Sequence, residues 1–240
     1  MEAAARIRPP VFEIGLKAYC WGAEAVRLAI EADELAAELG VSIVYDPQAV
    51  DIPAVVAATK RILVFAQHVD PVSPGRGVGA VLAEAVRAAG AVGTLLNHSE
   101  KPLSPDELGQ AIERARAVGL ATLVFADSPE EAATFARLGP DIVLAEPPDL
   151  IATGVSVGDV MAGFVAEAVE AVKGVDPRIL VMSGAGVSGP DDVEQVMRLG
   201  LDGTGSSSGI LRAPDPEAMM RAMLEATVRA WRELHPGWLP

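Results

Sequence analysis

The feature that most constrains the fold is a repeated alternation of eight short apolar runs, each followed by a segment with a helical pattern. The runs are too apolar to face water on either side, which is typical of parallel strands buried on both faces. Eight consecutive units of this kind favour an α/β fold in which a closed (β/α)8 barrel is wrapped by helices, rather than an open sheet. The expected strands are 11–17, 41–45, 62–66, 92–96, 120–125, 142–145, 179–182 and 201–204. The expected helices are 23–39, 53–59, 78–89, one opening at 104–107, 129–138, 157–172, 190–199 and 214–234.

Local signals support these element ends. Glycines follow two of the helices, Gly40 after 23–39 and Gly90 after 78–89, where a left-handed residue ends a helix well. Ser104 and Glu107 have the spacing of a capping box, with a proline between them at the first helical position. No stretch is typical of an interdomain linker, so we expect a single barrel domain over 1–240.

Composition narrows the functional classes. The chain has 240 residues, of which 50% are hydrophobic, and a formal net charge of −14. A nucleic-acid partner requires a basic surface, so this charge argues against one, and any anionic ligand must be held by a few local groups. One cysteine and three histidines give neither an internal disulfide nor a zinc site. Without a signal-peptide pattern or an apolar run of transmembrane length, we expect a soluble cytoplasmic protein with no membrane partner.

Polar side chains stand where several expected strands end. Along 11–17 the two-residue period puts Glu13, Gly15 and Lys17 on one face and apolar residues on the other. The apolar face suits the helix layer, so we expect Lys17 to point into the barrel mouth, as a possible anion ligand. Strand 92–96 is followed closely by His98 and Glu100. In this barrel class functional groups lie at the C-terminal ends of the strands, so these side chains are candidates for a site.

The segment after strand 142–145 holds a carboxylate followed by a stiff turn. Glu146 precedes two prolines, which disfavour helix and leave it extended at the strand end. The loop 147–154 has apolar residues at its tip and a glycine at its end, a pattern that predicts a lid closing over a small ligand.

Two loops rich in glycine and serine follow the last two strands, at 183–188 and 203–209. Their backbone N–H groups can approach an anion closely, and loops after strands seven and eight commonly bind phosphate in this barrel class. We expect a phosphate site there, with Lys17 as the one nearby cation.

In combination, these segments resemble triosephosphate isomerase, and in detail its archaeal-type branch. The matching stretches occur in the right order across most of the chain, at 17–19 (KAY), 46–48 (DPQ), 67–71 (QHVDP), 93–100 (GTLLNHSE), 145–154 (AEPPDLIATG), 184–188 (GAGVS) and 208–209 (SG).

The resemblance implies an aldose–ketose isomerase of glycolysis and gluconeogenesis that interconverts dihydroxyacetone phosphate and glyceraldehyde 3-phosphate. It implies that Glu146 is the base, that His98 is the neutral electrophile and that Lys17 binds the phosphate and stabilises the enediolate. No metal or organic cofactor is implied, and the partners are a small sugar phosphate and further copies of the chain in a homodimer or homotetramer. The positions that match substrate-binding positions of the family are Gly15, Lys17, Ile151, Gly186, Ser207 and Ser208.

Two departures from the family pattern concern neighbouring strands. The family has Asn at the position of Gly15, and two bulky aliphatic residues where this chain has Gly205-Ser206. Because the residues of this chain are smaller, the two departures leave space beside Lys17. The chain could therefore be an isomerase of another small sugar phosphate, such as a four-carbon ketose phosphate that would use this space. A sugar-phosphate-binding barrel without turnover, and a Schiff-base aldolase using Lys17, are further alternatives. A neighbouring side chain that fills the gap would remove the case for a larger substrate.

Overall fold

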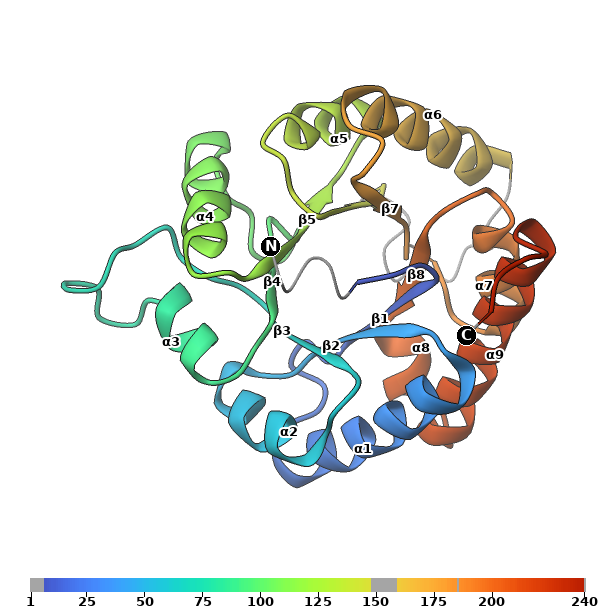
Figure 1. The fold of residues 1–240 in the computed structure, drawn as a ribbon, viewed down its shortest axis with the longest axis horizontal. Coiled ribbons are helices and arrows are strands. Elements are labelled where there is room, and N and C mark those ends of the chain that lie inside the picture. The colour runs from blue at the N-terminus through green and yellow to red at the C-terminus, as the bar shows by residue number, and fades with distance from the viewer. Residues whose placement is uncertain (1–6, 148–158, 185, 240) are drawn as a thin grey trace.

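The computed structural model describes residues 7–147, 159–184 and 186–239, and in it eight parallel strands close into a barrel in the order β1 to β8. Figure 1 shows the ring of strands with the helices arranged around it. Each strand pairs with the next along the chain, and β8 closes the ring on β1, where Val11 lies opposite Gly203. The expected (β/α)8 fold is confirmed.

The elements alternate throughout the described chain. The strands are β1 (Val11–Gly15), β2 (Ser42–Asp46), β3 (Leu63–Ala66), β4 (Gly93–Leu96), β5 (Ala121–Ala126), β6 (Ile142–Ala145), β7 (Leu180–Met182) and β8 (Gly203–Ser206). The helices are α1 (Gly22–Leu39), α2 (Ile52–Ala58) after the 3₁₀ turn η2 (Ala49–Asp51), α3 (Ala83–Ala88), α4 (Pro105–Ala117), α5 (Pro129–Ala136), α6 (Asp159–Val175), α7 (Pro190–Met197), α8 (Ser208–Leu211) and α9 (Pro216–Leu234). None of the helices in the described ranges combines the length and the apolar character needed to cross a membrane.

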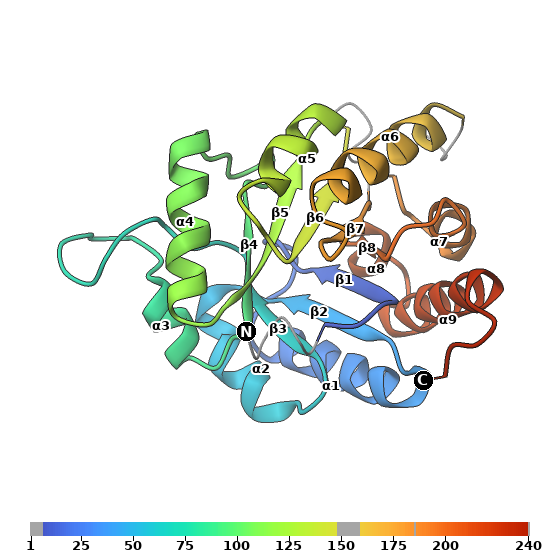
Figure 2. The same ribbon diagram turned by 45° about the horizontal axis from the view of Figure 1, so that its top comes forward.

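The third helix is the largest difference from the sequence-based expectation. A helix over 78–89 was expected, but α3 begins at Ala83, and the preceding residues form a loop that projects from the barrel between β3 and α3 (Figures 1 and 2). Asp70 holds this loop together, because its Oδ2 accepts from the Val81 N–H and its own N–H donates to the Val81 carbonyl at 2.9 Å. Gly79 has φ 84°, outside the helical region, so the helix cannot include residues 78–79 as expected.

The two-residue period divides the apolar residues of the strands between two layers. Phe12 and Ile14 point outward into the layer between barrel and helices, whereas Val11 packs inside the barrel. This confirms the faces expected for the first strand. The barrel interior is filled by Ile7, Val11, Val44, Leu63, Phe65, Leu95, Ala121, Leu123, Phe125, Ile142, Leu144 and Met182.

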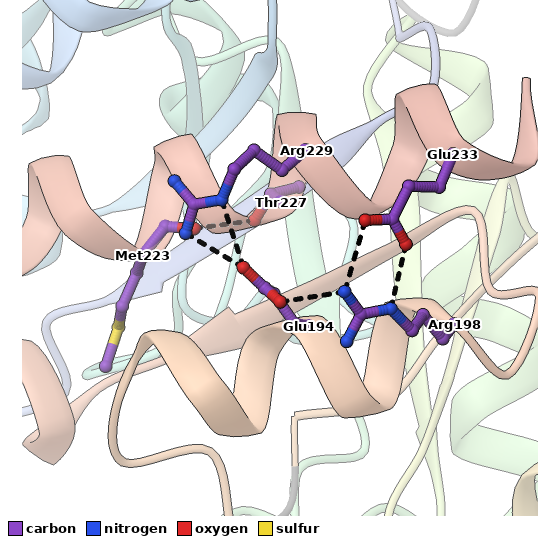
Figure 3. A network of polar contacts seen from close by, with 6 residues as sticks. All are labelled: Glu194, Arg198, Met223, Thr227, Arg229 and Glu233. Atoms are coloured by element: carbon purple, nitrogen blue, oxygen red, sulfur yellow. Dashed lines mark hydrogen bonds and ion pairs between the residues drawn. The ribbon is translucent and has the colours of Figure 1, made fainter. Parts of the chain in front are cut away.

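Charged side chains join the two helices that follow the last strands. Glu194 on α7 accepts from Arg198, the residue that follows this helix, and from Arg229 on α9. Arg198 also donates to Glu233 on α9 (Figure 3). Exposed ion pairs contribute little singly, but a network of bidentate pairs fixes geometry better than an isolated one. The network therefore helps to set how α7 lies against α9. Both helices lie outside β7 and β8, the strands that lead to the last two loops (Figure 1).

Candidate active site

One cavity of about 620 Å³ lies at the C-terminal ends of the strands. A second hollow, of about 480 Å³, lies at the opposite end of the barrel around residues 139–141 and 176–180, away from the candidate catalytic groups. The first cavity brings together most of the predicted site residues, namely Lys17, His98, Glu146, Gly186, Ser207 and Ser208. Ile151 and the predicted lid over 148–154 lie outside the described residues.

Glu146 follows β6 directly, where its N–H donates to the Ala126 carbonyl at 2.9 Å and so continues the strand pairing with β5. Its carboxylate reaches across to β7 and accepts a hydrogen bond from the Gly184 N–H. A Cβ at position 184 would lie 2.9 Å from Glu146 Oε1, so glycine permits this approach. Burial raises the pKa of Glu146 to about 7, against the opposing effect of the Lys17 charge. Glu146 is therefore balanced between acid and carboxylate near neutrality.

His98 stands after β4 on a turn that Asn97 fixes. Asn97 has φ 59°, and its amide bridges the turn, donating to the Phe125 carbonyl at 3.1 Å and accepting from the Leu103 N–H at 2.9 Å. The Phe125 ring also meets the imidazole edge-on, with the ring centroids 4.7 Å apart. These contacts give His98 a defined position beside the cavity.

The electrostatic surroundings of His98 favour its neutral form. The Glu100 N–H donates to His98 Nδ1 at 3.0 Å, so in the neutral ring Nε2 carries the hydrogen. Burial, followed by the charge of Lys17, lowers the pKa of His98 to about 4. Near neutral pH the imidazole is thus an uncharged hydrogen-bond donor.

Lys17 is held in a strained backbone conformation, with φ 45°. The side-chain amides of Gln48 and Gln67 both donate to the Lys17 carbonyl, and Gln67 also donates to the Asp46 carbonyl at 2.9 Å. The Lys17 ammonium pairs with Glu100 Oε1 at 2.7 Å across the cavity. The sequence motifs contain Gln48 and Gln67 but gave no sign of this supporting role.

The loops after β7 and β8 are tied together beside the cavity. Ser206 Oγ donates to the Val187 carbonyl at 2.9 Å, and a one-turn helix, α8, begins at Ser208, where only a loop was expected. Arg212, at the end of this turn, also lines the cavity and lies over the Tyr19 ring at 4.9 Å. The expectation that Lys17 is the one nearby cation is wrong, because Arg212 and Lys101 line the same cavity.

The space vacated by the two departures is filled by Glu13. Glu13 on β1 lies opposite Gly205 on β8, and its side chain lines the cavity although the residue is only 7% exposed. A Cβ at position 15 would lie 2.5 Å from Glu13 Oε1, and one at position 205 would lie 2.4 Å from Glu13 Oε2. Gly15, expected to bind substrate, is not among the residues that line the cavity. Both glycines thus make room for one carboxyl group.

Comparison with known proteins agrees with this geometry. A sequence model of the family described as triosephosphate isomerase matches residues 10–223. The triosephosphate isomerase of Methanobacterium bryantii is 38% identical over 210 residues, which cover 87% of this chain and 92% of that protein. The triosephosphate isomerase of Pyrobaculum calidifontis is 39% identical over 226 residues, covering 93% and 99% respectively. That of Saccharolobus solfataricus is 34% identical over 226 residues, with the same coverage. The chain therefore belongs to the triosephosphate isomerase family.

Proposed function

We propose that this chain is an aldose–ketose isomerase that interconverts dihydroxyacetone phosphate and glyceraldehyde 3-phosphate through an enediolate. The observation that supports it most directly is the pair of oppositely tuned groups at one cavity. Glu146 has a pKa raised to about 7, and His98 has a pKa lowered to about 4. A base and a neutral donor of these kinds are what proton transfer next to a carbonyl requires.

In the proposed reaction Glu146 takes a proton from the carbon beside the carbonyl. The electron pair of the broken C–H bond becomes the carbon–carbon double bond of the enediolate, and the former carbonyl oxygen takes up the negative charge. The Nε2–H of neutral His98 donates to that oxygen, and the Lys17 ammonium stabilises the charge. His98 gives its Nε2 proton to the former carbonyl oxygen and takes a proton from the neighbouring hydroxyl, so that proton moves between the two oxygens. Glu146 then returns the carbon-bound proton to the neighbouring carbon, whose former hydroxyl oxygen becomes the new carbonyl, and the isomerisation is complete without a net change in redox state.

The phosphate end of the substrate would lie at the other side of the cavity. Backbone N–H groups around Gly186, Ser207 and Ser208 can donate to it, as the resemblance implies, and Lys17 and Arg212 supply positive charge. Ile151, outside the described residues, is proposed as a further substrate contact from the family match alone.

Substitution of the base tests this function. Glu146→Gln keeps the size of the side chain but cannot accept the proton, so turnover of glyceraldehyde 3-phosphate should fall by about 10²- to 10⁴-fold or more. His98→Gln should also lower kcat, while KM changes less, because the lost donor acts mainly on developing charge. Kinetics in both directions, with circular dichroism to confirm folding, measures this, and full activity in the Glu146 variant would refute the assignment.

No observation favours the alternatives. The four-carbon substrate depended on vacated volume, and Glu13 occupies that volume. A barrel without turnover would not need the tuned pair of Glu146 and His98, and a Schiff-base aldolase would leave the same pair unused.

The assembly and location of the chain also remain proposals. By the same family resemblance we infer a homodimer or homotetramer in the cytoplasm.

A further inference from the structure

We propose that Glu13 is a substrate-recognition residue, a neutral carboxyl group that donates a hydrogen bond to a substrate oxygen from the floor of the cavity. This inference rests on the proposed isomerase function and adds a group that lies outside the sequence segments matching the family pattern. It is supported by the position of the side chain, by the carboxyl groups around it and by the glycines that accommodate it.

The position of Glu13 is set by two glycines on either side of its carboxyl group. Oε1 lies over Gly15, further up its own strand, and Oε2 lies over Gly205 on β8, at the distances given above. The side chain therefore runs up the barrel toward its mouth and fills the place of a side chain at position 15. A Cβ at position 15 would also lie 2.5 Å from Ser207 Oγ, so the Glu13 carboxyl reaches the region of the phosphate loops.

The groups that face Glu13 explain why it should keep its proton. Asp46 on β2 lies within hydrogen-bond reach of its carboxyl, Glu146 on β6 and Lys17 on β1 act on it through their charges, and its partner on β8 is a glycine. Three acidic groups around one cation cannot all ionise at low cost in a buried site. When Glu146 is ionised as the base and a phosphate dianion is bound, a charged Glu13 would repel both.

Asp46 supplies an independent sign of protonation. Its Oδ1 is buried and has no hydrogen-bond donor among the described residues if both carboxyl groups are ionised. A proton on Asp46, donated to Glu13, satisfies that atom. The proton on Glu13 is then left to point into the cavity, which gives a chain of hydrogen bonds from Asp46 to Glu13 to the substrate.

The pKa values of Glu13 and Asp46 are shifted in the direction that this geometry requires. Burial, then the charge of Glu146, raises the pKa of Glu13 to about 8, and these two causes outweigh the charge of Lys17 and the hydrogen bond with Asp46, which lower it. Burial, then Glu13, raises the pKa of Asp46 well above its usual range. At neutral pH both groups are therefore largely protonated in the free protein.

Two substitutions of similar volume separate donation from packing. Glu13→Gln keeps an N–H donor and is permanently neutral, so its kcat/KM at pH 7 should fall less than that of a variant without a donor. Glu13→Met fills the space without a donor, and kcat/KM should fall about tenfold, as expected for one lost hydrogen bond to substrate. In the wild type kcat/KM should decline as pH rises through about 8, and Glu13→Gln should lack that decline.

Infrared spectra in D₂O provide a readout that does not depend on turnover. The difference spectrum of the wild type minus Glu13→Gln at pH 7 should show a protonated-carboxyl band, in addition to any absorption that both proteins share from Asp46 and Glu146. The inference is overturned if this band is absent, if Glu13→Met equals the wild type in kcat/KM, or if Glu13→Gln keeps the alkaline decline. Failure of the proposed function would look different, because the wild type itself would then not isomerise triose phosphates whatever stands at position 13.

Discussion

At the scale of single residues, one cavity shifts the pKa values of the two proposed catalytic groups, Glu146 and His98, in opposite directions. Burial disfavours charge, so it raises the pKa of an acid and lowers that of a base. The Lys17 charge lowers both pKa values, reinforcing burial at His98 and opposing it at Glu146. Burial is the larger effect at each group, so the pKa of Glu146 lies near neutral pH whereas the pKa of His98 lies far below it. Burial in the cavity is thus the main cause of the pKa shift at both groups, and Lys17 modifies it.

The same scale explains why restoring the family asparagine alone should fail. In Gly15→Asn the new Cβ would meet Glu13 Oε1 and Ser207 Oγ, both at 2.5 Å. Overpacking of this kind typically costs about 1–3 kcal/mol of stability, and it would displace groups at the cavity. We expect a lower melting temperature and lower kcat/KM for triose phosphates.

A second substitution should rescue that variant. Glu13→Ala removes the carboxyl from the space above Gly15, so Glu13→Ala/Gly15→Asn should recover both stability and kcat/KM relative to Gly15→Asn. The control is Glu13→Ala alone, which has neither the carboxyl group at position 13 nor an amide at position 15. Its kcat/KM should stay below that of the wild type. A double variant no better than Gly15→Asn would show that Glu13 is not what excludes the amide.

At the scale of elements, the sequence predicted the strands and the site positions that follow from them. Alternation and apolar runs were sufficient to place Glu146 at the end of β6 and His98 after β4, because strand order fixes which ends meet. The start of α3 was missed because the Asp70–Val81 contacts are not visible in periodicity. The pattern also placed Glu13 on the inner face, but no one-dimensional signal shows that its side chain runs up the barrel over Gly15.

A support element beside the site gives the next prediction. Gln67 follows β3 and joins the ends of β1 and β2 through the Lys17 and Asp46 carbonyls. Gln67→Leu removes both bonds and leaves the strained Lys17 backbone held by Gln48 alone, so we expect a loss of about 1–3 kcal/mol in stability. Because small displacements of a catalytic group are costly, kcat/KM should fall about tenfold to a hundredfold.

The matched control is a helix cap whose residues do not line this cavity. Ser104 caps α4 by accepting from the Glu107 N–H, and its own N–H donates to Glu107 Oε2 at 2.9 Å. Ser104→Ala should cost about 1 kcal/mol of stability with kcat/KM unchanged. If both variants lose stability and neither loses activity, Gln67 supports the fold but does not position Lys17.

At the scale of the whole molecule, a chain with net charge −14 has to bind a phosphate dianion. Local placement resolves this conflict, since Lys17, Lys101 and Arg212 line the same cavity while most acidic groups lie elsewhere on the surface. The acidic groups that do line it are either paired, as Glu100 is with Lys17, or have raised pKa values. Neutral carboxyl groups therefore limit the negative field where the substrate binds.

The cost of those buried acids should appear as a pH dependence of global stability. A carboxyl whose pKa is raised in the folded state binds its proton more tightly than in the unfolded chain, so its contribution is present at low pH and is lost as pH rises through the folded value. For Glu13 and Glu146 this loss runs from their ordinary pKa of 4.5 up to about 8 and about 7, so the part due to Glu13 continues above neutrality. His98, with its pKa lowered to about 4, acts in the opposite direction, but only below the pKa of about 6.5 that it has when unfolded. Between pH 7 and 8.5 the free energy of unfolding should therefore fall by about 1–2 kcal/mol through Glu13 and Glu146, and further through Asp46, whose pKa is raised well above its usual range. Glu13→Gln should lessen that fall more than Glu146→Gln does, as measured by urea denaturation at each pH. A wild type whose stability is constant or rises over this range would show that Glu13 is already ionised at neutral pH.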